Sequence, residues 1–173
     1  MHNSGGPKGG ALIEAKPEDF FQAFQNHIGS AQTLAKLLVP GLKAEKFGRI
    51  IKVISTSVKA PIANLGISNT IRAAMASWAK TLANEVGSHG ITVNNILPGF
   101  TATPRLESLR KATAEKMKIA ESDVEKNWLA TIPAARFAKP EETASAISFL
   151  ASPLASYING INLPVDGGRT PSL

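Results

Sequence analysis

The chain has no cysteine, which excludes a disulfide scaffold, a thiolate zinc site and a cysteine nucleophile. We assign no other metal ligands either. Aromatic residues make up only 6% of the chain, so few rings are present on which nucleic-acid bases could stack. Charged residues make up 18% and hydrophobic residues 43%, a balance typical of one folded domain and not of a disordered chain.

Long apolar runs are also missing. No stretch approaches the ~20 consecutive apolar residues that cross a bilayer. The opening MHNSGGPKGG lacks the apolar segment of a secretory signal. We therefore expect no membrane partner and a location in the cytoplasm.

The charge balance is basic, with a net charge of +6 and an isoelectric point near 9.7. Lysines and arginines are scattered from Lys8 to Arg169, and no run is longer than Arg110–Lys111. A nucleic-acid partner is one reading of such a balance. A site for an anionic cofactor, or solubility alone, explains the charge equally well, and we expect no nucleic-acid partner.

The apolar periodicity indicates a single domain over residues 1–173 in which helices and strands alternate. After a loop over residues 1–16, three- and four-residue steps from Pro17 predict a helix that ends at Pro40–Gly41. Strand, helix, strand, a polar helix-prone region, helix and strand follow, which predicts a parallel sheet covered by helices. Their expected ranges are Arg49–Ile54, Ile67–Val86, Ile91–Leu97, 101–132, Glu141–Ala151 and Ile161–Val165.

Four segments, spread over nearly the whole chain, have the order and spacing of the motifs of a known protein family. They are Asn3-Ser4-Gly5-Gly6, the strand from Gly48 to Ser55, the turn Leu97–Thr103, and the closing helix and strand within 136–168. Together they resemble the short-chain dehydrogenase/reductase family. The resemblance implies an α/β fold with an incomplete Rossmann-like, doubly wound parallel sheet that lacks the N-terminal strands. The family's glycine-rich phosphate turn has no counterpart in these residues.

The family's catalytic positions fall on unusual residues here. Its serine is matched by Ser55, its tyrosine thirteen residues later by Ser68, and its lysine four residues after that by Arg72. Its asparagine, twenty-one residues before Gly48, is matched by His27. In the family the tyrosine is the acid in carbonyl reduction, because the lysine lowers the pKa of its phenol. Serine is a weaker acid and has a shorter reach, so the resemblance implies weak or no activity for this chain.

Each of these residues has two readings. Ser55 either holds a substrate carbonyl or caps the end of its strand. Arg72 either contacts the cofactor ribose or is a solvated or ion-paired helix residue. His27 either donates a proton near neutral pH or is structural or solvent-facing. The two tryptophans, at 78 and 128, are interpreted as packing residues.

The resemblance also implies NAD or NADP as the cofactor. The cofactor-binding positions carried over are Asn3, Gly5, Arg72, Pro98, Gly99, Phe100, Thr101 and Thr103.

Two functions follow from the resemblance. The first is an oxidoreductase that transfers hydride to or from a small carbonyl or alcohol, with residues 101–132 as the substrate loop. In that loop Leu106, Leu109, Met117 and Trp128 favour an apolar ligand or simply pack. The second is a non-catalytic relative that acts as a subunit of a homodimer or homotetramer. Its contact surface would include Phe20, Phe24, Met75 and Trp78.

Overall fold

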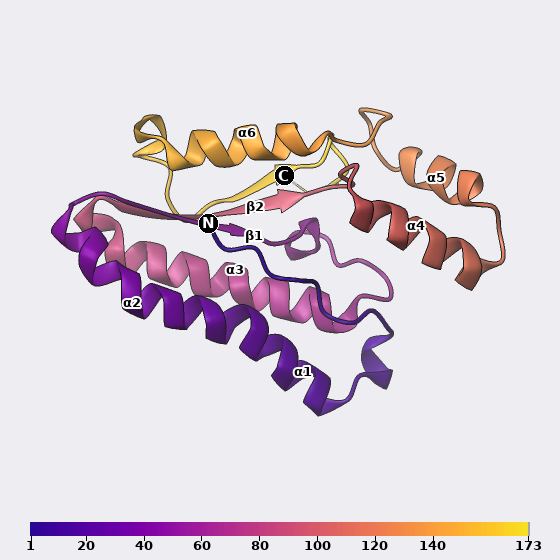
Figure 1. Cartoon of the computed structure of the whole chain (residues 1–173), viewed down its shortest axis with the longest axis horizontal. Helices are drawn as coiled ribbons and strands as arrows, with labels where there is room; N and C mark the ends of the chain where they lie inside the picture. The colour runs from indigo at the N-terminus through magenta and orange to yellow at the C-terminus, as the bar shows by residue number, and fades with distance from the viewer. Residues whose placement is uncertain (173) are drawn as a thin grey trace.

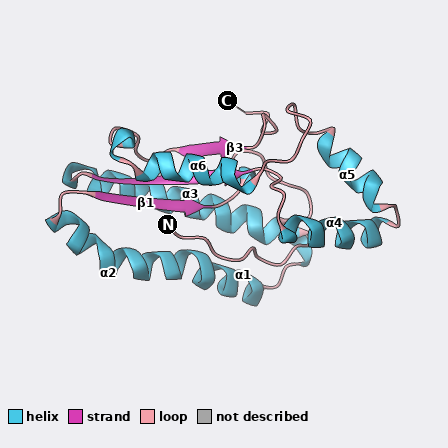
Figure 2. Ribbon diagram, turned by 45° about the horizontal axis from the view of Figure 1, so that its top comes forward, coloured by secondary structure: helices cyan, strands magenta, loops and turns pink. Residues whose placement is uncertain are grey.

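The computed structural model describes residues 1–172, which form an α/β fold of three layers (Figures 1 and 2). The middle layer is a parallel sheet in the order β1-β2-β3. Helices cover both faces of the sheet, and further helices extend beyond its end (Figure 1). The strands are β1 (Gly48–Val53), β2 (Ile91–Pro98) and β3 (Asn162–Val165). The helices are α1 (Pro17–Phe24), α2 (Ser30–Ala44), α3 (Gly66–Val86), α4 (Pro104–Met117), α5 (Glu121–Leu129) and α6 (Pro140–Ala151).

The α/β class, the parallel pairing and the order of elements are as the sequence predicts. Alternate residues of β1 face opposite layers, because side chains alternate along a strand. Ile50 packs towards α3, whereas Ile51 contacts the core beneath α6. The strands therefore have apolar residues on both faces, as a covered parallel sheet requires.

The first predicted helix differs from expectation in two ways. A π-helical turn, Gln25–Gly29, separates α1 from α2, and such turns often occur at functional sites. The helix also does not end at Pro40–Gly41 but continues to Ala44. Val39 and Leu42 pack against the core of α3 and the sheet on either side of the proline, and this burial outweighs the hydrogen bond that proline cannot make.

The N-terminal segment runs along the outer edge of β1. The His2 amide donates to the carbonyl of Ile51 at 2.8 Å, and the Val53 amide donates to the carbonyl of His2 at 3.1 Å. This bridge is parallel. The N-terminal segment therefore lies beside the carboxyl end of β1.

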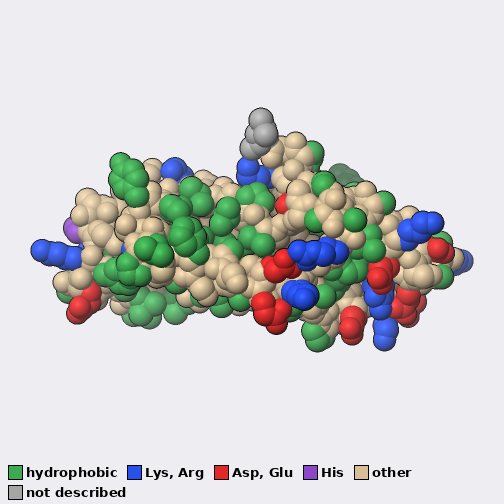
Figure 3. All heavy atoms as spheres, turned by 90° about the horizontal axis from the view of Figure 1, so that it is seen from above, with side chains coloured by type: hydrophobic (Ala, Val, Ile, Leu, Met, Phe, Trp, Pro, Cys, Tyr) green, Lys and Arg blue, Asp and Glu red, His purple; other side chains and the backbone are tan. Residues whose placement is uncertain are grey.

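Two helices from the 101–132 region extend beyond the sheet. Arg110 on α4 donates to Glu121 at 3.1 Å and to Glu125 at 2.7 Å, which ties α4 to α5. Seen from above, many charged side chains lie over this half of the molecule, and hydrophobic side chains gather over part of the other half (Figure 3). Within the described part of the chain, none of the helices has the length and apolar character needed to cross a bilayer.

Candidate active site

A cavity of about 620 Å³ opens at the carboxyl ends of β1 and β2. Parallel sheets bind ligands at this edge. Its walls come from the N-terminal segment, the end of β1, the first two turns of α3, the turn after β2 and the starts of α4 and α6. All of the site residues predicted from the sequence except His27 line it: Asn3, Gly5, Ser55, Ser68, Arg72, Pro98, Gly99, Phe100, Thr101 and Thr103.

Ser55 lies two residues beyond the end of β1 and borders the cavity. Its Oγ accepts a hydrogen bond from the amide of Ser57 at 3.1 Å, which caps a short helical turn over Thr56–Val58. Ser55 thus has a capping role, but it caps this helical turn and not the strand itself, and the role is compatible with binding because a hydroxyl oxygen also has a proton to donate.

Ser68 and Arg72 are one turn apart on α3 and line the same cavity. Arg72 is only 8% exposed, and none of the ion pairs found in residues 1–172 includes it. The solvated or ion-paired reading is wrong. Its Nη1 donates to the carbonyl of Val53 at 3.1 Å, but its buried Nε has no partner. Burial first, and then the charge of Arg105, lower the pKa of the guanidinium.

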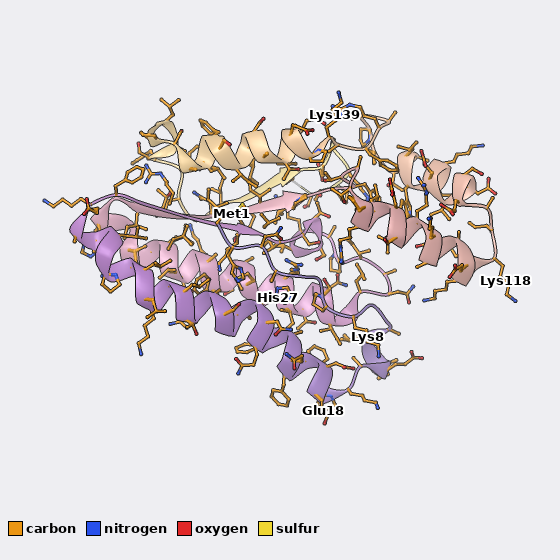
Figure 4. All side chains as sticks on the ribbon, viewed as in Figure 1. Met1, Lys8, Glu18, His27, Lys118 and Lys139 are labelled. Carbon is orange, nitrogen blue, oxygen red and sulfur yellow. The ribbon has the colours of Figure 1, made fainter. Side chains whose placement is uncertain are left out.

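His27 lies behind the cavity wall, on the π-helical turn that faces α3 (Figure 4). It is 3% exposed, so the solvent-facing reading is wrong. Its Nδ1 lies 2.6 Å from the Oγ of Ser4, which does line the cavity. Burial first, and then the charges of Arg72 and His2, lower its pKa to about 4. His27 is therefore neutral at pH 7 and reaches the cavity only through Ser4.

The turn after β2 is held in place by packing and backbone bonds. The Gly99 amide donates to the carbonyl of Val165 at 2.9 Å, and a Cβ on Gly99 would lie 2.7 Å from the Cα of Asp166. Position 99 thus requires glycine because the residue that follows β3 approaches so closely, and this holds whether or not Gly99 also contacts a ligand. Phe100 stacks on Trp128 with ring centroids 4.8 Å apart, which joins this turn to α5 and confirms Trp128 as a packing residue.

The 101–132 region contributes part of the cavity wall. Leu106 and Leu109 line the cavity, as expected of a substrate loop. Met117, 57% exposed, lies outside it. The apolar contribution of the loop is therefore narrower than its composition predicts.

The wall includes residues that the sequence reading did not assign to the site, and Ser4 and Arg105 are the two with a polar contact or a charge that bears on it. Ser4 stands inside a recognised segment, yet its partner His27 is remote in sequence. Arg105 follows Thr103 by two residues at the start of α4. A lone arginine in a polar stretch gives no periodic signal, so only its place beside the turn after β2 could have indicated it.

The residues in the wall suit a ligand with hydroxyl and anionic groups. They offer side-chain hydroxyls from Ser4, Ser55, Ser68 and Thr103, and two guanidinium groups. The fold and the cavity define the class as an α/β protein with a parallel sheet and a cavity at the carboxyl ends of its strands, the edge at which such sheets bind ligands.

The family follows from comparison with known proteins. The family model described as enoyl-(acyl carrier protein) reductase matches residues 1–170. The chain belongs to the short-chain dehydrogenase/reductase family.

Curated relatives in this family are similar to nearly the whole of this chain. It is 35% identical over 170 residues to 3-oxoacyl-[acyl-carrier-protein] reductase FabG of Vibrio cholerae serotype O1, covering 97% of this chain and 64% of the relative. It is 36% identical over 161 residues to the NADPH-dependent reductase BacG of Bacillus subtilis, covering 93% and 61%. The chain thus spans less than two thirds of the length of these relatives.

Solved structures confirm the Rossmann-like fold. L-sorbose reductase from Gluconobacter frateurii, solved with NADPH and L-sorbose, matches with a TM-score of 0.90 at 33% identity, covering 99% of this chain and 65% of that one. YwfH, an NADPH-dependent reductase involved in bacilysin biosynthesis, matches with a TM-score of 0.89 at 30% identity, covering 98% and 65%.

Proposed function

We propose that the chain takes part in NAD(P)-dependent hydride transfer to or from a small carbonyl or alcohol compound. The observation that carries this proposal is the cavity at the carboxyl ends of β1 and β2, which gathers the residues that match the family's site positions. The family relationship and the NADPH-dependent relatives support it.

The wall residues fit the nicotinamide end of such a cofactor. Thr101 and Thr103 offer hydroxyls on the turn after β2, while Asn3 and Gly5 form the facing wall. The unpartnered Nε of Arg72 is a buried donor that a ribose hydroxyl would satisfy. The cofactor would supply the hydride, and the protein would orient it and the substrate.

Proton transfer is the weak step in this proposal. Ser55 would hold the substrate oxygen, and Ser68 stands where a stronger acid is needed. An aliphatic hydroxyl is a poor general acid near neutral pH, because efficient acids have a pKa near the ambient value. Arg72 keeps its proton at all ordinary pH values and cannot relay one. We therefore propose slow turnover.

His27 acts in this proposal as a positioning residue. Its neutral ring fixes the Ser4 hydroxyl at the cavity wall through the 2.6 Å hydrogen bond. With a pKa of about 4, its ring is not an imidazolium at pH 7 and therefore does not serve as a general acid.

Titration with NADPH and NADH, followed by the fluorescence of the reduced nicotinamide, tests the proposal. We expect saturable binding, and replacing Thr103 with valine is expected to weaken it roughly fivefold through loss of one hydrogen bond. Thr113→Val is the matched control, because Thr113 lies on α4 and bonds the Leu109 carbonyl instead. Absence of binding to the wild-type chain would reject the proposal.

A second candidate function, as a subunit of a homo-oligomer, is favoured by exposed apolar residues on α2. Leu34, Leu37 and Leu38 share one face by their spacing and are 45%, 71% and 58% exposed. Phe24, 46% exposed, belongs to the expected contact surface. Met75 does not, because it is 2% exposed in the core, and Trp78 is half-buried against the same core.

Replacing Leu37 and Leu38 together with glutamate is expected to convert the assembly to monomers, since charge cannot be buried in an apolar contact without a partner. Sedimentation velocity measures this. Leu154→Glu is the control, because Leu154 is 83% exposed on a different surface. A wild-type chain that sediments as a monomer at all concentrations contradicts the assembly.

A further inference from the structure

Ser4 and His27 form a hydrogen-bonded pair to which the proposed hydride transfer gives only a positioning role. The Oγ of Ser4 lies 2.6 Å from the Nδ1 of His27, and Ser4 lines the cavity. Among the described residues 1–172, no other group bonds to this oxygen. A hydroxyl at hydrogen-bond distance from an imidazole, with its remaining lone pair free, is the arrangement of an activated serine nucleophile.

The ring of His27 is in the protonation state that a general base needs. Burial first, and then the charges of Arg72 on α3 and His2 on the N-terminal segment, lower its pKa to about 4, so the ring is neutral at pH 7. Lys52 on β1 acts in turn on His2. In the tautomer that carries its proton on Nε2, the Nδ1 of His27 accepts the proton of the Ser4 hydroxyl.

Two backbone amides that follow Ser4 are free to bind an oxyanion. Gly5 and Gly6 line the same cavity, and within residues 1–172 their amides donate to no protein acceptor. A Cβ on Gly5 would meet nothing within 4 Å, so there is open space for a substrate beside Ser4. In serine hydrolases the amide of the residue after the nucleophile is one of the donors that stabilise the tetrahedral oxyanion.

We propose that the chain also hydrolyses activated esters, with Ser4 as the nucleophile and His27 as the general base. The inference does not rest on hydride transfer, and it applies to the chain without cofactor because Gly5 is shared with the proposed nicotinamide site. A base with a low pKa takes up a proton weakly, so the ester needs a leaving group that departs as a stable anion. Leu106 and Leu109 in the wall favour an apolar acyl group. Aryl esters of short fatty acids have both properties.

The reaction takes place in two balanced steps. In the first, the Oγ of Ser4 bonds to the acyl carbon, its proton passes to the Nδ1 of His27, and the carbon–oxygen bond to the leaving group breaks. His27 then returns the proton to the aryl oxide. In the second, water gives a proton to Nδ1 while its oxygen bonds to the acyl carbon. The bond to Ser4 breaks, Oγ recovers the proton from His27, and the carboxylic acid is released.

Hydrolysis of p-nitrophenyl butyrate by the chain without cofactor tests the inference, with mass spectrometry of peptides after an acid quench to locate the butyryl group. We expect that group on Ser4, and Ser4→Ala is expected to reduce hydrolysis to the background rate. His27→Asn is expected to slow acylation about 100-fold, because a weak base contributes at the low end of the usual range. Ser108→Ala is the matched control, because Ser108 bonds the Pro104 carbonyl and lies outside the cavity.

The pH profile separates a base from a residue that only supports the fold. The part of the rate that Ser4→Ala removes is expected to persist from pH 7 to pH 5 and to fall as pH approaches 4, where His27 gains a proton. A midpoint near ~6.5, the ordinary value for histidine, overturns the role of His27 and indicates an exposed histidine such as His89. A butyryl group found on a lysine, on the N-terminal amine or on another serine overturns the role of Ser4, as does hydrolysis that Ser4→Ala leaves unchanged.

Discussion

Replacing Ser68 with tyrosine is expected to raise the rate constant for carbonyl reduction by about 100-fold, the lower end of what a positioned general acid contributes. Ser68 is 9% exposed and lines the 620 Å³ cavity, whose volume has room for an added ring. Arg72 stands one turn away. Its positive charge would favour the ionised phenol and so lower the pKa from about 10 towards the working range.

Steady-state NADPH oxidation at several pH values measures this effect. Because the phenol must be protonated to act as the acid, the gain is expected to fall as pH rises through the pKa of the new tyrosine. Ser68→Phe is the matched control, since it adds the same ring without the hydroxyl. A gain of equal size in the phenylalanine variant would show that the ring improves packing or substrate binding and supplies no proton.

The fold could be predicted from the sequence because its signals are local and repeated. The steps of α3 and the apolar runs of β1 and β2 each persist over several residues, and the structure follows them closely. The end of α2 was misjudged because proline is a local stop signal. Contacts of Val39 and Leu42 with a distant helix override it, and such contacts have no signature within the segment itself.

Only those site residues that come directly after a strand could be predicted from the sequence to lie together. Ser55 and the turn at Pro98–Gly99 come directly after β1 and β2, so topology alone brings them to one edge. Ser4 and Arg105 gave no such signal, because their roles depend on partners remote in sequence. The unpaired Nε of Arg72 is likewise a fact of three-dimensional packing, and it separates a ligand-ready arginine from a solvated one.

A lysine inside the sheet is a further departure from what the sequence indicates. Lys52 is the penultimate residue of β1, and it is only 2% exposed. Its Nζ lies 4.9 Å from the ring centroid of Trp78, whose Nε1 donates to Gln32 at 2.8 Å. Burial lowers the pKa of Lys52 from 10.5 to about 8. The folded protein therefore holds a positive charge at neutral pH in surroundings that disfavour it.

Replacing Lys52 with methionine is expected to raise the free energy of unfolding at pH 7 by about 1 to 2 kcal/mol. The lowered pKa corresponds to an unfavourable contribution of about 3 kcal/mol, at 1.36 kcal/mol per pKa unit. Loss of the attraction between the ammonium and the indole ring offsets about 1 to 2 kcal/mol of the gain. Methionine keeps an unbranched chain of similar length in the same space. Urea unfolding at fixed pH measures the difference.

The pH dependence separates a charge effect from better packing. Between pH 8 and 10.5 the unfolded chain binds more protons at this lysine than the folded protein does, so wild-type stability rises with pH in that window. The advantage of the Lys52→Met variant is therefore expected to be full below about pH 8 and to shrink as pH approaches 10.5. Lys116→Met is the control, because Lys116 is exposed on α4 and its replacement should change stability little at any pH. If the stability advantage of Lys52→Met stays constant from pH 7 to 10.5, the gain comes from better packing and not from removal of the buried charge.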